Sequence, residues 1–303
     1  LGLFCRSTRP TSIMARGVFA CSLALRMREK GLCERVCFDG RGAYAAEWKE
    51  YRIVDDDELI AQVEPAERQS VVESDYRLAV SNALIEHWRT DYGYTDNDHV
   101  VIPCTLSSSK KFLLDSKTVD HTRNQSGFAP DDIVLVYAGS TAGWQSFSML
   151  QELIIPFLEN CPGGRMVFLS HPDENTDQLC SRFPDRVNVK WLHPNEVHSM
   201  LSACDHGILI REDSVTNRVA SPTKFAEYLA AGLRVVITDH IGDMSQETRE
   251  SDLGVIWNPG NRSLESLNRV SKEEKLRLAA YADSHYSKRA FSKQYEQLIA
   301  RLA

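Results

Sequence analysis

Short apolar runs alternate along the chain with stretches in which apolar residues recur at helical spacing. The runs have the length of buried parallel strands, and strands are expected at 35–39, 77–81, 99–102, 133–137, 165–169, 187–191, 207–210, 235–238 and 253–257. Residues 12–30 are expected to form a helix, and residues 56–75 a second helix that Pro65 breaks or kinks. The alternation predicts an α/β protein with parallel sheets.

The alternation stops between residues 105 and 130, where Ser, Lys, Asp, Asn and Gly dominate. Such a stretch predicts a linker, so the chain is expected to divide into domains at 1–118 and 119–285. Residues 286–303 are expected to form a terminal helix, whose apolar face predicts core packing. A hinge between two α/β domains places a ligand site between them.

The segment 205–243 carries the densest set of local signals. Its pattern predicts a helix between two apolar strands. Ser221 is expected to cap that helix, Pro222 to occupy its first position and Gly232 to end it. In the same way, Asn195 is expected to cap the helix that precedes this segment. These signals predict where each helix begins, and therefore which backbone N–H groups have no hydrogen-bond partner within the helix.

Lys224 lies in the first turn of the predicted helix, where a positive charge opposes the helix dipole. The position becomes favourable when an anion lies above the helix. The free N–H groups, the dipole and Lys224 therefore predict a phosphate site. Glu227 follows one turn later on the same face. The alternative is an ordinary helix with an exposed lysine and glutamate.

Two further loops follow apolar strands, where open parallel sheets bind their ligands. In the sequence Asp39-Gly40-Arg41-Gly42, Arg41 could hold a carboxylate, a phosphate or sugar hydroxyls, or it could be a solvated arginine in a turn. Gly139 and Ser140 begin a weak phosphate-loop pattern, for which a structural turn is an equal alternative. No Lys or Arg occurs from 138 to 163, so phosphate charge would be met by Lys224, with Arg211 or Arg218.

Composition narrows the classes of function. The net charge is −7 and no basic run occurs, which argues against a nucleic-acid partner. The eight cysteines are scattered without zinc-ligand spacing, as in a cytosolic protein with reduced thiols, and no metal site is expected. No signal peptide or membrane-spanning run is visible. Because the chain begins at Leu1 and its first half is the shorter one, we expect the true N-terminus to be missing.

The run Ser221-Pro222-x-Lys224-x-x-Glu227-Tyr228-x-Ala230-x-Gly232-x-x-Val235 resembles the signature of bacterial group-1, family-4-like nucleotide-sugar glycosyltransferases. The resemblance implies a GT-B fold, with two Rossmann-like domains whose parallel sheets face a central cleft. It also implies that the terminal helix crosses back onto the first domain. Many relatives carry a second glutamate eight residues before the position of Glu227, where this chain has Val219.

The resemblance also implies roles for individual residues. Lys224, Glu227 and Arg211 become the candidate catalytic residues, with Glu227 binding the ribose hydroxyls of the donor. The full set expected to bind the donor is Gly139, Ser140, Trp191, His193, Ser221, Pro222, Thr223, Lys224 and Glu227. The segment FDGRGAYAAEW resembles a loop that faces the cleft in these enzymes, which makes Asp39, Arg41 and Glu47 the candidate acceptor-side residues.

The implied activity is transfer of a sugar from a nucleotide-diphosphate donor to a hydroxyl of a glycan or lipid-linked acceptor. It would serve cell-surface polysaccharide or glycolipid synthesis, with retention of configuration and without a metal or another cofactor. The expected location is the cytoplasm, or peripherally the inner face of the plasma membrane. The alternatives are a GT-B sugar-nucleotide epimerase and a non-catalytic nucleotide-sugar-binding module.

Overall fold

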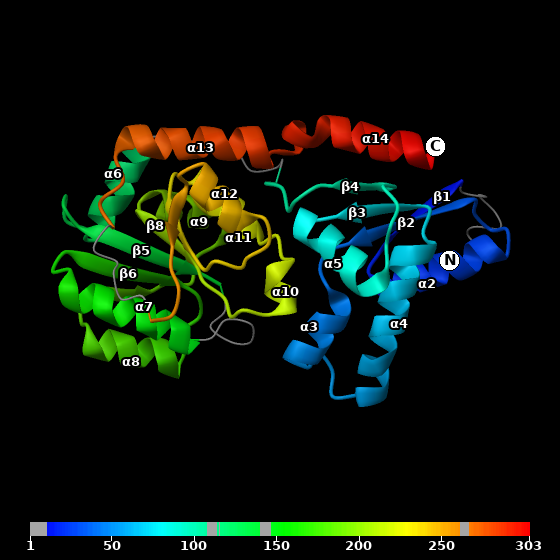
Figure 1. The fold of residues 1–303 in the computed structure, drawn as a ribbon. Helices are drawn as coiled ribbons and strands as arrows, with labels where there is room; N and C mark the ends of the chain where they lie inside the picture. The colour runs from blue at the N-terminus through cyan, green and yellow to red at the C-terminus, as the bar shows by residue number, and fades with distance from the viewer. Residues whose placement is uncertain (1–10, 108–113, 115, 140–146, 261–266) are drawn as a thin grey trace.

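Two parallel sheets form the frame of the molecule. The computed structural model describes residues 11–107, 114, 116–139, 147–260 and 267–303. One sheet has the order β1-β2-β3-β4 and the other the order β10-β9-β8-β5-β6-β7, and all pairs are parallel. Each sheet carries its own helices, which gives two lobes side by side (Figure 1). We call the lobes first and second in chain order.

The first lobe begins with a strand that the sequence did not predict. Its elements are β1 (Ser12–Arg16), α2 (Val18–Glu29), β2 (Arg35–Gly40), α3 (Tyr44–Tyr51), α4 (Asp57–Glu73), β3 (Tyr76–Ala79), α5 (Asn82–Tyr92) and β4 (His99–Val101). The prediction of one helix over 12–30 was wrong at its start, because residues 12–16 pair with β2, and it is confirmed for Val18–Glu29. Gly17, at φ 82°, separates that strand from α2.

Pro65 does not break α4, which is continuous over 17 residues. The proline lies on the exposed side of the helix, where water can bind the carbonyl group that loses its partner. The prediction of a break at this proline was therefore wrong.

Helices α2 and α4 pack over the sheet around Leu25, Phe38 and Trp88, which are completely buried.

The second lobe includes part of the region that was predicted to be a linker. Its elements are α6 (Ser116–Gln125), β5 (Ile133–Ala138), α7 (Phe147–Asn160), β6 (Gly164–Leu169), α8 (Glu174–Arg182), β7 (Val187–Val189), α9 (Pro194–Ser202), β8 (His206–Leu209), α10 (Val215–Arg218), α11 (Thr223–Ala230), β9 (Arg234–Ile237), α12 (Met244–Glu250), β10 (Gly254–Ile256) and α13 (Lys272–Tyr286). Helix α6 occupies much of 105–130, so that region is not all irregular.

A buried ion pair explains why α6 forms in so polar a sequence. The Nη1 atom of Arg123 lies 3.2 Å from the Asp205 carboxylate and donates to the Ala203 carbonyl at 2.8 Å. Both charged side chains are buried. Local periodicity does not reveal such a tertiary anchor, which fixes the helix to the second lobe.

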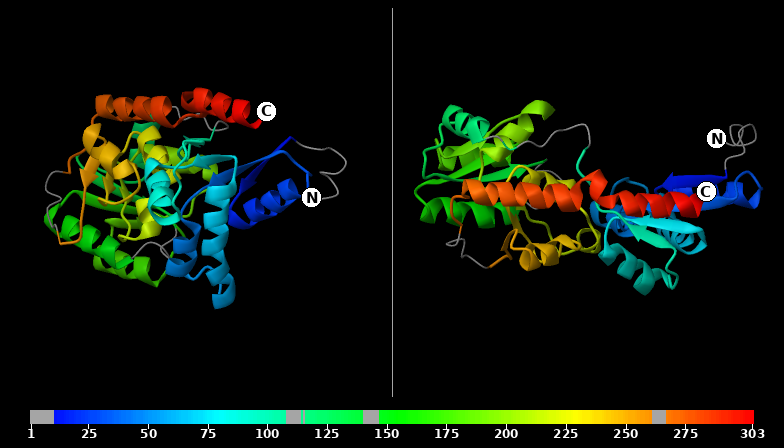
Figure 2. Two further views of the ribbon diagram at one scale, coloured as in Figure 1. Left: turned by 45° about the vertical axis from the view of Figure 1, so that its right-hand side comes forward. Right: turned by 90° about the horizontal axis from the view of Figure 1, so that it is seen from above.

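The C-terminal part of the chain runs along both lobes (Figure 2). Helix α13 ends at Tyr286, a short 3-10 helix covers Lys288–Phe291, and α14 (Ser292–Leu302) follows. The expectation of one helix from Tyr286 was therefore wrong at its start. The ring of Tyr286 contacts Phe225 in the second lobe, whereas Leu298 of α14 is buried against the first sheet.

Each lobe caps a helix of the other. The Glu50 carboxylate accepts hydrogen bonds from the N–H groups of Val215 and Thr216, at 3.0 and 3.3 Å. In the opposite direction, the Asp243 carboxylate accepts from the N–H groups of Asn82 and Ala83, at 2.7 and 3.0 Å. Carboxylates at helix starts also interact favourably with the helix dipole. These contacts hold the two lobes in one arrangement.

Within the described part of the chain, none of the helices has the length and hydropathy needed to cross a lipid bilayer.

Candidate functional site

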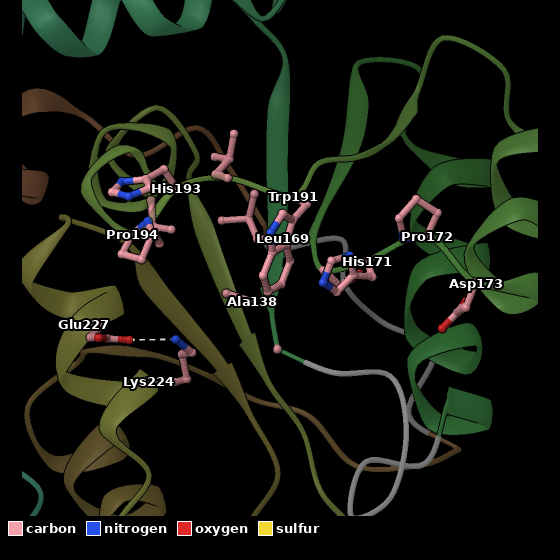
Figure 3. Close-up of a pocket in the computed structure, with 14 residues that line it drawn as sticks. Ala138, Leu169, His171, Pro172, Asp173, Trp191, His193, Pro194, Lys224 and Glu227 are labelled. Carbon is pink, nitrogen blue, oxygen red and sulfur yellow. Dashed lines mark hydrogen bonds and ion pairs between the residues drawn. The ribbon is translucent and has the colours of Figure 1, made fainter.

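A cavity of about 730 Å³ lies at the carboxyl ends of the strands of the second lobe (Figure 3). Strands β5, β6 and β7 are neighbours in a parallel sheet, so the loops that follow them meet at one edge. Helix α11 closes the other side. The lining residues are Ala138, Gly139, Leu169, Ser170, His171, Pro172, Asp173, Trp191, Leu192, His193, Pro194, Val197, Lys224 and Glu227.

Two stacked rings form one wall of this cavity. The rings of His171 and Trp191 are 3.7 Å apart between centroids and 17° from parallel, and Trp191 is 66% exposed. His171 follows β6 and Trp191 follows β7, so adjacent strands deliver the two rings. The sequence predicted a binding role for Trp191 only. An exposed, supported indole of this kind offers a surface on which a planar ring can stack.

His193 lines the cavity and also caps α9. Its Nδ1 atom accepts from the N–H of Asn195 at 3.5 Å, while the Glu196 carboxylate accepts from the N–H of His193 at 3.0 Å. Helix α9 begins at Pro194, two residues earlier than a cap at Asn195 would require. The prediction that Asn195 caps this helix was therefore wrong.

Helix α11 begins at Thr223 after Pro222, and no side chain caps its first N–H groups. The expectation that Ser221 caps it was wrong. The Ser221 hydroxyl instead accepts from the N–H of Cys104 at 3.0 Å, a contact with the segment that leaves the first lobe. The helix start therefore keeps N–H groups that an anion can bind.

Lys224 and Glu227 meet at the cavity. Their Nζ and Oε2 atoms are 2.8 Å apart, as the dashed line in Figure 3 marks. Both side chains are partly exposed, so neither charge is lost to the interior. The structure thus places the two predicted donor residues beside each other and beside the stacked rings. Their catalytic and binding roles stay predictions.

Tyr228 holds α11 against the sheet, a role that the sequence did not suggest. Its hydroxyl accepts from the N–H of Ala138 at 3.0 Å and donates to the carbonyl of Ile208 at 3.3 Å. The ring lies directly over Gly207, where an added Cβ would be 2.4 Å from ring carbons. Tyr228 therefore fixes the distance between α11 and the ends of β5 and β8, and with it the position of Lys224.

The loop after β5 is described only at its start. Gly139 lines the cavity, as the predicted donor site requires. Ser140 lies outside the described residues. Pro222 and Thr223 form the start of α11 but do not line the cavity, and Ser221 faces the first lobe.

Arg211 lies outside the cavity, between the lobes. Its Nη1 atom donates to Asn217 Oδ1 at 3.2 Å, and the Asn217 amide donates to the Tyr51 hydroxyl at 3.1 Å. Burial lowers the pKa of Arg211, with Tyr51, Tyr137 and Glu47 acting in the opposite direction. Burial raises the pKa of Glu47, and Arg211 opposes that shift. The structure therefore brings Glu47 close to Arg211 rather than to Asp39.

Asp39 and Arg41 form an ion pair at the end of the first sheet. The Arg41 Nε atom lies 2.7 Å from Asp39 Oδ1, and the Nε atom of Arg16 lies 2.8 Å from Asp39 Oδ2. Sequence reasoning missed Arg16, because the predicted helix over 12–30 hid the strand that ends there. Only the parallel pairing of β1 with β2, seen in the structure, shows that Arg16 lies beside Asp39.

A buried glutamate supports α3, the helix that carries Glu47 and Glu50. Glu67 accepts from the N–H groups of Tyr44 and Ala45, at 3.0 and 2.8 Å, and from the Tyr92 hydroxyl at 3.0 Å. Burial raises the pKa of Glu67 to about 7, although the three hydrogen bonds act against the rise. Between about pH 4.5 and pH 7, the folded protein therefore holds a proton at this carboxyl group that the unfolded chain releases.

We expect the free energy of unfolding to fall as the pH rises from about 4.5 to about 7, by up to about 3 kcal/mol, because the folded state binds the proton more tightly there. In Glu67→Gln, which cannot titrate, this decrease should be absent. Urea unfolding of both proteins at half-unit steps between pH 4.5 and 8 measures the difference. Parallel curves would contradict the assignment.

Among the described residues, no group of three or more His, Cys, Asp and Glu side chains is arranged to hold a metal ion.

Comparison with known proteins identifies the fold. No family model and no curated protein matches the sequence. Sucrose-phosphate synthase from Thermosynechococcus elongatus has a similar structure, with a TM-score of 0.72 and 11% identity over 99% of this chain and 75% of that chain. HepE from Anabaena, solved with UDP and glucose, gives 0.63 and 14% over 96% and 77%. WaaG, a glycosyltransferase of lipopolysaccharide biosynthesis, gives 0.61 and 14% over 87% and 76%.

Identities this low show a shared fold and nothing finer. The chain has the α/β GT-B fold, with two Rossmann-like parts built on parallel sheets, and that prediction is confirmed.

Proposed function

We propose that this chain is a glycosyltransferase that moves a sugar from a nucleotide-diphosphate donor to a hydroxyl acceptor. The observation that carries the proposal is the cavity of the second lobe. It combines a helix start without a side-chain cap, the Lys224–Glu227 pair and an exposed stacked indole. The structural neighbours include a sucrose-phosphate synthase and a glycosyltransferase of lipopolysaccharide biosynthesis, and HepE was solved with UDP and glucose.

The cavity suits the three chemical parts of the nucleoside diphosphate in a nucleotide sugar. The base would stack on Trp191, whose other face His171 supports. The diphosphate would lie at the start of α11, within reach of its N–H groups and of Lys224. Glu227, released from Lys224 by the arriving phosphate, would accept hydrogen bonds from the ribose hydroxyls. The ion pair between Lys224 and Glu227 would thus keep both side chains beside the place that we propose for the donor.

The chemical step requires charge stabilisation on the leaving diphosphate. Preorganised N–H groups and a lysine supply it where negative charge develops, which makes electrostatic stabilisation the main contribution of this site. Following the resemblance of the α11 motif, we propose transfer with retention and without a metal ion. The same resemblance supports a glycan or lipid-linked acceptor in cell-surface polysaccharide or glycolipid synthesis, in the cytoplasm or at the inner membrane face.

The direct test measures binding of UDP, GDP and ADP by calorimetry and the release of nucleoside diphosphate from the corresponding sugars. We expect at least one nucleotide to bind, and Trp191→Ala to weaken it about tenfold, the size of one base–aromatic stack. Ile299→Ala removes an equally exposed apolar side chain from α14 and should leave affinity unchanged. Interconversion of the donor sugars would indicate an epimerase, and binding without turnover a non-catalytic module; either result would contradict the proposal.

A further inference from the structure

Three charged side chains meet at the carboxyl edge of the first sheet, away from the donor cavity. Asp39, near the end of β2, is 2% exposed and binds two arginines, Arg16 and Arg41. The cluster therefore carries one net positive charge. The start of α2, immediately after Gly17, adds the positive end of a helix to the same edge.

The buried carboxylate orients both guanidinium groups. Arg16 and Arg41 each contact Asp39 through Nε, and Nη2 of Arg41 makes a further bond of 3.3 Å to Oδ2. Among the residues that the structure describes, no acceptor is found for the terminal nitrogens of Arg16. These nitrogens form a fixed, planar pair of donors, the geometry that matches a carboxylate or a phosphate.

A purely structural ion pair does not account for the second arginine. One guanidinium is enough to balance a buried carboxylate, and Arg41, two-thirds buried, already does so. The Arg16 side chain is 68% exposed, so ordering it on Asp39 costs side-chain entropy for a weak surface contact. An anion bound between the two arginines would neutralise the excess charge.

The cluster lies on the side of the first lobe that meets the second. Strands β1, β2 and β3 are parallel neighbours that end at this edge, and the hydroxyl of Ser81, which follows β3, donates to the carbonyl of Val219 in the second lobe at 2.7 Å. The segment that follows Arg41 leads into α3, which contacts α10 of the second lobe. The arginines therefore lie at the edge of the first sheet that meets the second lobe, the side from which we expect the molecule receiving the sugar to enter.

We propose that Arg16 and Arg41, oriented by Asp39, bind an anionic group of the acceptor, a phosphate monoester or a carboxylate. That the bound molecule is the acceptor rests on the proposed function, whereas the anion site itself does not. The acceptor class thus becomes a hydroxyl compound with a negative charge, such as a sugar phosphate or a uronic acid, and neutral sugars become poor ligands.

The test measures the affinities of glucose 6-phosphate, glucuronate and glucose by calorimetry on the full chain, with saturating UDP present to occupy the donor cavity. We expect one of the two anions to bind at least tenfold more tightly than glucose. This preference should fall in Arg16→Gln and disappear, leaving equal affinities for anion and glucose, in the double variant with Arg41→Gln. The arm that binds identifies the anion as a phosphate ester or a carboxylate.

Arg26→Gln is the matched control, because it removes the same charge from an exposed position on α2 and should leave all affinities unchanged. Equal affinity for anionic and neutral sugars would overturn the proposal, and so would an anion preference that survives in the double variant. The affinity for UDP is measured separately. A protein that binds the anion but no nucleotide would refute the donor site and keep the anion site.

Discussion

Replacing Lys224 by methionine is expected to lower kcat/KM for the nucleotide sugar by about 10²–10³-fold, the usual loss when one group that stabilises developing charge is removed. The reason is geometric. Tyr228 fixes α11 on the sheet, so the N–H groups at its start cannot move to replace the missing ammonium group. The segment 138–163, which includes the loop after β5, contains no Lys or Arg that could replace it. Release of nucleoside diphosphate at varied donor concentration measures the effect.

Two companion variants sharpen this experiment. Lys272→Met removes an exposed lysine from the start of α13 and should leave turnover unchanged. Glu227→Ala should weaken donor binding by about 1–3 kcal/mol, the scale of a lost hydrogen bond to a charged group. Because Lys224 and Glu227 contact each other at 2.8 Å, the double variant should deviate from additivity. Wild-type turnover in Lys224→Met would rule out its assigned role.

Gly207→Ala is expected to destabilise the protein by about 3 kcal/mol, near the upper end for overpacking of a core. An added Cβ would lie 2.4 Å from the ring of Tyr228, a ring that is itself buried between β8 and α11. The helix would have to move outward, and the hydrogen bonds of the Tyr228 hydroxyl would lengthen with it. We therefore expect a loss of UDP affinity together with the loss of stability, measured by urea unfolding and calorimetry.

Gly42→Ala provides the comparison, since nothing lies within 4 Å of its added Cβ, and it should change stability by less than about 0.5 kcal/mol. Combining Gly207→Ala with Tyr228→Leu should recover part of the loss, because the smaller side chain leaves room for the methyl group. Equal stability of the two glycine variants would show that the sheet and α11 are not in close contact.

The sequence was most informative where local and tertiary requirements agree. The apolar runs at 133–137 and 165–169 became β5 and β6, and Gly232, at φ 77°, ends α11 as its position suggested. Lys224, Glu227, Trp191 and His193 all line one cavity because the chain leaves β7 and β8 at the same edge of one parallel sheet. This meeting was expected from the resemblance of the α11 motif and not from the strand pattern alone.

The failures have physical causes. Serine is a residue type favoured at helix caps, but the Ser221 hydroxyl accepts a hydrogen bond from the N–H of Cys104, which is 117 residues away in the chain. Helix α6 is stabilised by the buried Arg123, whose partner lies in another element. Residues 12–16 show a spacing compatible with a helix, and only pairing with β2 makes them a strand. In each case a distant group outweighed the local preference.

The chain crosses between the lobes at two places that touch each other. The N–H of Leu106, after the first crossing, donates to the carbonyl of Tyr286, at the start of the second, with a length of 2.8 Å. Two crossings joined at one point leave rotation about that point as the easiest relative motion of the lobes. Helix α3, which carries Glu50, and helix α10 lie away from this pivot (Figure 1), and the Glu50 carboxylate joins them. A small rotation about Tyr286 would therefore be enough to break the contact between Glu50 and α10, because a displacement grows with distance from the rotation point.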